Sequence, residues 1–285
     1  MPATVHIIGA SGRSGVALCR SLAADDVPFV PVVRDAAKWR ATGLGEMPRV
    51  ADLGDAARLR DALADATWIV NCAHARHTPA VLAAAPAGAS LVLLGSTRKF
   101  TRWPDPHGNG VLAGEAAFLA SGRRGVMLHP TMIYGAQGED NVQRLAAVLR
   151  RLPAVPLPDG GSALVQPIHQ DDVTRAIRAS LDRAWDGAQT LVIAGPAPLS
   201  YAEFVRTVAV SSGQRSPRIL TISPAVSMVL AHVLCYIPLL PRLRAEEVRR
   251  LMEDKNFDVH PMIDTLGFTP MSLADGLSRT FGYRS

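Results

Sequence analysis

The sequence predicts an α/β protein, with a Rossmann-type doubly wound parallel sheet and a smaller, mostly helical C-terminal cap domain. Three observations support this prediction. A short apolar run at residues 5–8 is followed at once by Gly9, Gly12 and Gly15. Strand-like and helix-like stretches then alternate up to Gly195, which is typical of a parallel sheet with helical crossovers. Beyond Gly195, helical stretches and chain breakers prevail and strand-like runs are few.

Short apolar runs that end at glycine, proline or polar residues are typical of buried parallel strands. On this basis the predicted strands span residues 5–8, 28–34, 49–55, 67–73, 90–96, 125–135 and 190–195. Longer stretches rich in alanine and leucine predict helices, which span residues 15–24, 56–64, 78–85, 111–120, 141–152 and 171–183. Proline and glycine crowd residues 97–110 and 153–162, so we expect no regular structure in either segment.

These elements divide the chain into two predicted domains. The dinucleotide-binding domain comprises residues 1–135 and 164–196, and the substrate-binding cap comprises residues 136–163 and 197–285. With 285 residues, 48% of them hydrophobic, the chain is long enough to bury a core in each domain.

The formal net charge is +5, but basic residues are scattered and do not alternate with aromatic residues, so we expect no nucleic-acid partner. A phosphorylated cofactor or a small nucleotide-linked substrate fits this charge better. The three cysteines lie far apart without metal-ligand spacing, which predicts neither a metal site nor a disulfide framework. We expect no signal peptide and a cytoplasmic protein.

The glycine-rich loop after the first strand predicts a dinucleotide site. Gly9 permits a sharp turn, Gly12 lets a pyrophosphate approach the backbone, and Gly15 lets the helix pack closely on the strand. The positive end of that helix then faces the anion. The alternative is an ordinary glycine-rich turn. The other predicted cofactor contacts of the loop are its remaining polar residues, Ser11, Arg13 and Ser14.

The residues that end the second strand select the cofactor. An acidic residue there binds the ribose 2′-hydroxyl of NAD, whereas an arginine pairs with the 2′-phosphate of NADP. Arg34 comes first, with Lys38 one helical turn later, so NADP(H) is favoured over NAD(H). Asp35 leaves NAD(H) as an open alternative. Arg13 could be a second cation on the 2′-phosphate.

The spacing Gly-x-x-Gly-x-x-Gly resembles that of the short-chain dehydrogenase/reductase superfamily, in its extended or atypical branch. Segments 130–135, 166–173, 195–205 and 251–270 resemble the same branch, most closely its NAD(P)-dependent nucleotide-sugar epimerase/dehydratase group. The resemblance implies that family members pair as dimers through the helices after the fourth and fifth strands. It also implies three sets of cofactor contacts. Asp52 and Leu53 would contact adenine, and Asn71, Cys72 and Ala73 would pass the adenine ribose. Pro130, Thr131 and Met132 would meet the nicotinamide carboxamide.

The superfamily's chemistry depends on a Tyr-x-x-x-Lys motif, which the resemblance places near the start of the 111–120 helix. No tyrosine of this chain precedes a lysine at that spacing: the residues four places after Tyr134, Tyr201 and Tyr236 are Gly138, Val205 and Leu240, and Tyr283 lies too near the end. One register puts His107 and Val111 at the tyrosine and lysine positions. Another register puts Val111 and Glu115 there.

The remaining catalytic candidates are Ser96, Lys99, His107 and Tyr134. Ser96 follows the fifth strand, where the family polarises the substrate oxygen, and Tyr134 is expected to line the substrate pocket. His107 could transfer a proton near neutral pH, or be a solvated loop histidine. Lys99 could place an ammonium near the nicotinamide, or be a surface cation.

Three other histidines are assigned no catalytic or metal role. We expect His74 and His77 to be loop residues, and His169 to form a hydrogen bond at the start of the helix that follows it.

Two functions therefore stay open. The chain is an NADP(H)-dependent oxidoreductase or epimerase of a small, nucleotide-linked substrate, or it holds NADP(H) without catalysis as a structural or redox-sensing protein. Residues 221–241 are very apolar but interrupted by prolines, which leaves them too short to span a bilayer. They form a cap helix that lines the substrate pocket or, with the arginines up to residue 250, dock on the inner face of a membrane.

Overall fold

The computed structural model describes residues 4–135, 141–223, 225–226, 249 and 252–282. Its centre is a seven-stranded sheet with the order β11-β6-β5-β4-β1-β2-β3, in which every neighbouring pair is parallel. The strands are β1 (Val5–Ile8), β2 (Phe29–Val33), β3 (Arg49–Val50), β4 (Trp68–Asn71), β5 (Ser90–Leu94), β6 (Gly125–Pro130) and β11 (Ala188–Ile193). The predicted Rossmann-type sheet is therefore confirmed.

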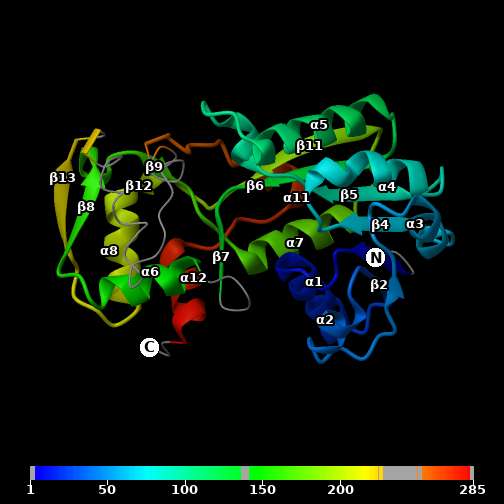
Figure 1. Cartoon of the computed structure of the whole chain (residues 1–285), viewed down its shortest axis with the longest axis horizontal. Helices are drawn as coiled ribbons and strands as arrows, with labels where there is room; N and C mark the ends of the chain where they lie inside the picture. The colour runs from blue at the N-terminus through cyan, green and yellow to red at the C-terminus, as the bar shows by residue number, and fades with distance from the viewer. Residues whose placement is uncertain (1–3, 136–140, 224, 227–248, 250–251, 283–285) are drawn as a thin grey trace.

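Helices cover both faces of this sheet (Figure 1). One layer contains α1 (Arg13–Ala24), α2 (Ala36–Arg40), α7 (Gln170–Leu181) and α11 (His260–Leu266). The other contains α3 (Ala56–Leu63), α4 (Thr78–Ala84) and α5 (Pro106–Ala120). Along β5, Leu91 and Leu93 pack towards α3–α5, whereas Val92 and Leu94 pack towards α1 and α7. Each apolar strand thus fills two cores, because successive side chains point to opposite faces.

A third cluster of buried residues lies at the left of Figure 1, where the cap is predicted. It is built by α6 (Asn141–Leu149), α8 (Tyr201–Ser211) and α12 (Leu273–Phe281). Three short strand pairs accompany these helices: β7 (Ile133–Tyr134) with β10 (Ile168–His169), β8 (Ala154–Pro158) with β13 (Arg218–Ile222), and β9 (Leu164–Val165) with β12 (Leu199–Ser200).

Two predictions of irregular structure are wrong. Residues 154–158 form β8, which pairs with β13 alone, and proline is tolerated in a strand with a free edge. Residues 97–110 contain the 3₁₀ helix η2 (Thr97–Phe100) and the start of α5. Pro106 suits the first position of a helix, and Asp105 caps α5 by accepting a hydrogen bond from the Gly108 amide at 2.7 Å.

Smaller differences concern other element boundaries. The third strand is two residues long, the predicted 125–135 strand divides into β6 and β7, and α2 was not predicted. Helix α11 lies in the segment assigned to the cap, but its Met262 and Leu266 are buried against the central sheet. The domain boundaries themselves stay a prediction.

None of the helices described is long and apolar enough to cross a membrane. The segment for which membrane docking is predicted, residues 221–250, lies mostly outside the described residues.

Candidate cofactor and active site

The glycine loop lies where β1, between β2 and β4, gives way to α1. Gly9 has a φ of +73°, a conformation that side-chain-bearing residues rarely adopt. The Gly12 amide donates a hydrogen bond to the Gly9 carbonyl at 2.9 Å, which closes the turn, and Gly12 is the N-cap of α1. The carboxyl ends of β1 and β4 at the centre of such a sheet are where Rossmann folds bind dinucleotides.

Added Cβ atoms show why this loop requires glycine. At Gly15 the added Cβ would lie 2.3 Å from the Gly9 carbonyl oxygen, a clash that cannot be relieved by a side-chain movement because the neighbour is a backbone atom. At Gly9 it would lie 3.0 Å from the Ala73 nitrogen. At Gly12 the one neighbour within 4 Å is the Gly9 oxygen at 3.1 Å, so this residue otherwise faces open space. Gly9 and Gly15 therefore serve close packing, and Gly12 leaves the backbone accessible to a phosphate, so the loop fits a dinucleotide.

Beside this loop, the Ser14 hydroxyl donates a hydrogen bond to the Gln170 side chain on α7 at 3.1 Å, and so ties α1 to α7. Ser11 is half-buried and Arg13 is exposed.

Two cations and one acid are exposed at the end of β2: Arg34, Lys38 and Asp35. Both Asp35 carboxylate contacts are with α2, whose amides of residues 37 and 38 donate hydrogen bonds at 2.8 and 3.1 Å. The Arg34 side chain is 83% exposed and has only a loose 3.9 Å contact with Asp52. Lys38 is exposed on α2. Both hydrogen bonds go to the Oδ1 atom of an exposed residue, so Asp35 keeps the NAD(H) alternative open.

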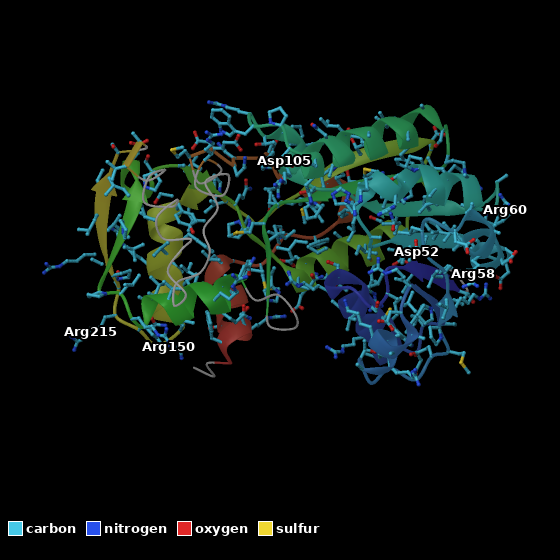
Figure 2. The ribbon with its side chains drawn as sticks, viewed as in Figure 1. Asp52, Arg58, Arg60, Asp105, Arg150 and Arg215 are labelled. Carbon is cyan, nitrogen blue, oxygen red and sulfur yellow. The ribbon has the colours of Figure 1, made fainter. Side chains whose placement is uncertain are left out.

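The predicted adenine and ribose contacts lie at the ends of β3 and β4. Asp52 is exposed and Leu53 packs against the α3–α5 core (Figure 2). Asn71 is fully buried: its side-chain oxygen accepts a hydrogen bond from the Ala73 amide at 3.1 Å, and its amide nitrogen has no partner among the described residues. Cys72 donates its backbone amide to Ile8, and burial raises the pKa of its thiol to about 12.

At the end of β6, the Pro130 carbonyl accepts a hydrogen bond from the Thr97 hydroxyl at 3.2 Å. The Thr131 hydroxyl is buried without a hydrogen-bond partner among the described residues, and Met132 is 37% exposed. A buried hydroxyl without a partner costs free energy, and a carboxamide bound here would satisfy it.

A buried charge cluster joins β5, β6 and α5. Lys99 Nζ lies 2.5 Å from Glu115 Oε2, and His129 Nε2 lies 3.0 Å from the same oxygen. The Lys99, Glu115 and His129 side chains are 9%, 15% and 1% exposed. His129 Nδ1 accepts the Ser96 amide at 3.2 Å, so the neutral ring carries its proton on Nε2 and donates it to Glu115.

The surroundings favour the neutral form of this ring. Burial, followed by the charge of Lys99, lowers the pKa of His129 to about 4. A Cβ at Gly95 would lie 2.3 Å from His129 Nδ1, so glycine is needed for the ring to pack beneath the Ser96 turn. The Ser96 hydroxyl accepts a hydrogen bond from the Arg98 amide at 3.2 Å and retains its own proton for donation.

His107, Val111 and Glu115 follow one another at four-residue spacing along one side of α5. The His107 ring is exposed and meets the His74 ring edge-on, with centroids 4.2 Å apart. Val111 is buried in the α3–α5 core, and Glu115 binds Lys99. Neither proposed register therefore places a tyrosine–lysine pair on α5.

Tyr134 is 1% exposed and belongs to the third cluster. Its ring lies against His169, with centroids 5.2 Å apart, and its hydroxyl lies so close to Gly276 that a Cβ there would be 2.0 Å away. Burial raises the pKa of this phenol. The structure thus brings Ser96 and Lys99 together, and places Tyr134 separately among the cap helices.

His169 caps α7 by accepting a hydrogen bond from the Asp171 amide at 3.1 Å, as predicted. His74 likewise caps the 3₁₀ helix η1 (Ala75–His77). Within the described part of the chain, no group of three or more metal-ligating side chains could hold a metal ion. His129 is the site residue that sequence reasoning missed, although a histidine in an otherwise apolar strand is a signal that could have revealed it.

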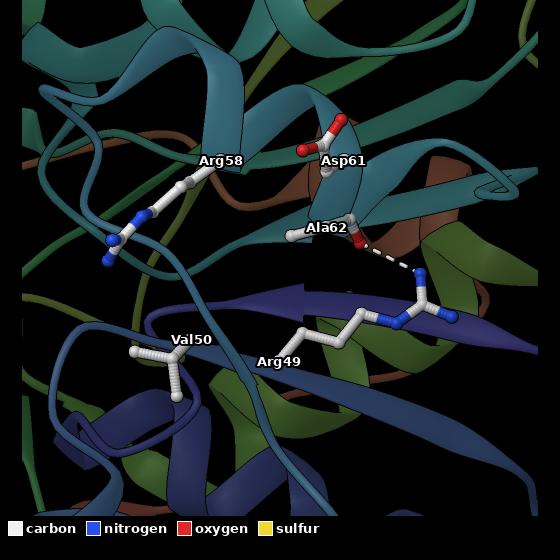
Figure 3. A pocket seen from close by; sticks show the side chains of 5 residues that line it. All are labelled: Arg49, Val50, Arg58, Asp61 and Ala62. Carbon is white, nitrogen blue, oxygen red and sulfur yellow. Dashed lines mark hydrogen bonds between the residues drawn. The ribbon is translucent and has the colours of Figure 1, made fainter.

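A hollow of about 380 Å³ lies elsewhere, between β3 and α3 (Figure 3). It is lined by Arg49, Val50, Arg58, Asp61 and Ala62. The Arg49 guanidinium donates to the Ala62 carbonyl at 2.9 Å and pairs with Asp65. None of these lining residues is a predicted cofactor contact or catalytic candidate.

Comparison with known proteins supports the fold. No protein-family model and no curated protein matches the sequence, whereas many solved structures share the architecture. MoeE5 in complex with UDP-glucuronic acid and NAD is 21% identical, with a TM-score of 0.73 over 98% of each chain. The chain has the fold of NAD(P)-binding epimerases and reductases.

Two further structures illustrate the range of that fold. UDP-glucuronic acid 4-epimerase from Bacillus cereus, in complex with UDP-glucuronic acid and NAD, is 15% identical, with a TM-score of 0.74 over 98% of each chain. The NADPH-dependent quinone oxidoreductase QOR2 from Escherichia coli, complexed with NADPH, is 20% identical, with a TM-score of 0.73 over 97% of this chain and 99% of that chain. At these identities the likeness establishes the fold alone.

Proposed function

We propose that this chain is an NADP(H)-dependent oxidoreductase or epimerase that acts on a small substrate. The observation that carries the proposal is the glycine loop, in which Gly12 leaves the backbone open at the start of α1 while Gly9 and Gly15 are packed against backbone. Neighbours of the same fold bind NAD or NADPH, and two are complexes with a UDP-sugar acid. A nucleotide-linked substrate is therefore the first class to test.

The chain's residues have distinct roles in this proposal. The start of α1, with Arg13, holds the diphosphate, and Arg34 and Lys38 bind the 2′-phosphate. The bound nicotinamide supplies or accepts a hydride. The Ser96 hydroxyl donates a hydrogen bond to the substrate oxygen, which polarises the carbon that is reduced or oxidised.

Lys99 follows Ser96 in η2, and in this proposal its ammonium stabilises negative charge on the substrate oxygen, while Glu115 holds the ammonium in place. His107, exposed at the start of α5, is the candidate proton carrier between this site and solvent.

Purified protein tests the proposal directly. We expect NADPH to bind, and to be oxidised in the presence of a substrate from a panel of nucleotide sugars, quinones and other carbonyl compounds. Lys99→Ala and His107→Ala are expected to reduce turnover while NADPH affinity stays within about threefold. Absence of NADPH binding contradicts the proposal.

Two observations favour a second function. Helix α5 carries no tyrosine on the side of His107, Val111 and Glu115, and Lys99 is already paired with Glu115. In this alternative the chain holds NADP(H) as a structural group or redox sensor. NADPH that binds, dissociates slowly and is not oxidised by any compound of the panel supports the alternative. Turnover that both alanine variants lose excludes it.

A further inference from the structure

The chain is poor in aromatic residues, with 4 Trp, 4 Tyr and 7 Phe, yet it exposes two of them on one loop. Phe100, the last residue of η2, and Trp103, between η2 and α5, are 51% and 49% exposed. The Phe257 ring lies next to Phe100, with centroids 5.6 Å apart. Large rings left partly exposed together indicate a binding surface, because folding normally buries them.

We call Phe100, Trp103 and Phe257 together the aromatic platform, and hydrogen bonds hold the backbone next to these rings. The Glu253 carboxylate is buried and accepts hydrogen bonds from the Thr101 hydroxyl at 2.9 and 3.0 Å and from the Arg102 amide at 2.6 Å. The Gln166 side chain accepts from the Phe257 amide at 2.7 Å and donates to the Phe257 carbonyl at 3.1 Å. Segments more than 90 residues apart thus hold the backbone that carries these rings, which favours a preformed surface for a ligand.

The platform continues directly from the proposed catalytic residues. Phe100 ends η2, whose N-cap is Ser96, and Lys99 Nζ lies 4.8 Å from the centre of the Phe100 ring. The Arg249 guanidinium lies 5.3 Å from the centre of the Trp103 ring. Asp105, which ends this loop, is labelled between the sheet and the cap cluster in Figure 2.

We propose that the aromatic platform binds a planar conjugated ring of the substrate by stacking. Flat ring faces beside two cations suit a nucleobase or a quinone, and both share the π-stacking chemistry that exposed Phe and Trp side chains provide. A substrate stacked on Phe100 would have its remainder next to Lys99 and Ser96. This inference rests on the proposed function, and it adds the means by which the substrate is recognised.

Calorimetric titration with two probes, uridine diphosphate and a water-soluble naphthoquinone sulfonate, tests the platform. Each titration is performed with and without NADP⁺. The double variant Phe100→Ala with Trp103→Ala is expected to lower the affinity for whichever probe binds the wild-type protein at least tenfold. The variant Phe100→Tyr with Trp103→Phe keeps flat faces and is expected to stay within threefold of wild type. Met47→Ala, at an 87% exposed residue before β3, is the control.

The probe that binds identifies the nucleobase or the quinone as the ligand class. Failure of both probes to bind wild-type protein overturns the platform, as does an alanine variant that binds as well as wild type. NADP⁺ affinity is expected to be the same in all variants. Wild-type protein that does not bind NADP⁺ overturns the proposed function instead, whatever the probes show.

Discussion

Replacing Glu115 by glutamine tests whether a buried charge cluster holds α5 to the ends of β5 and β6. Its carboxylate lies 2.5 Å from Lys99 Nζ and 3.0 Å from His129 Nε2, and all three side chains are at least 85% buried. Removing one partner of a buried ion pair costs about 3–5 kcal/mol, because the other charge stays poorly solvated. Glutamine keeps the shape and can still accept one hydrogen bond, so we expect about 3 kcal/mol, the low end of that range. For a chain of this size the loss lowers Tm by roughly 6–12 °C.

Urea unfolding followed by circular dichroism at pH 7 measures this loss. The double variant Lys99→Met with Glu115→Gln removes both charges, and it is expected to recover most of the free energy of unfolding. Arg58→Gln is the matched control: its ion pair with Asp55 is 3.4 Å long on the surface, and its removal should change stability by less than about 0.5 kcal/mol. The reasoning is refuted if Glu115→Gln is as stable as this control, or if the double variant is less stable than Glu115→Gln alone.

Three further predictions concern the cofactor loop, the pH dependence and the assembly. Gly12→Ala is expected to weaken NADPH binding about 100-fold, or 2.7 kcal/mol, with little change in Tm. Gly15→Ala should instead destabilise the fold by about 2–3 kcal/mol, because its Cβ meets backbone. Fluorescence titration measures the binding and thermal melts measure the stability, and equal effects of the two variants would contradict the assigned roles. Burial lowers the pKa of His129 from 6.5 to about 4, so the unfolded chain binds more protons between these pH values and stability falls as pH is lowered through that window. Urea unfolding of His129→Asn should show a shallower fall, and an identical pH profile would contradict a buried neutral ring. Leu112 and Leu119 are about half exposed on α5, and we expect a homodimer through this face and α4. Light scattering should find a dimer, and glutamate at both positions should convert it to a monomer. A monomeric wild-type protein would argue against this dimer.

Much of the fold could be predicted because it depends on local patterns. Buried parallel strands are continuous apolar runs, so the β1, β4 and β5 runs are visible without tertiary information. The glycine loop is equally local. Residues 154–158 were misjudged because their prolines suggest a loop, and only pairing with residues 218–222, some 60 residues later, makes them a strand.

The candidate site is harder to predict than the fold. Lys99 was identified as a candidate, but its distances to Glu115 and His129 depend on how η2, α5 and β6 pack, which the sequence does not display. Tyr134 illustrates the reverse case. It follows the sixth strand as a pocket residue would, yet tertiary packing buries it against Gly276.

The central claim is that the glycine loop and Arg34 hold NADP(H). Equilibrium titration of the wild-type protein and of Arg34→Ala with NADPH and with NADH tests this claim most directly. We predict that the wild-type protein binds NADPH at least tenfold more tightly than NADH, and that Arg34→Ala removes most of this difference because the 2′-phosphate loses its cation. Binding of neither dinucleotide, or a preference for NADH that Arg34→Ala does not change, would contradict the claim.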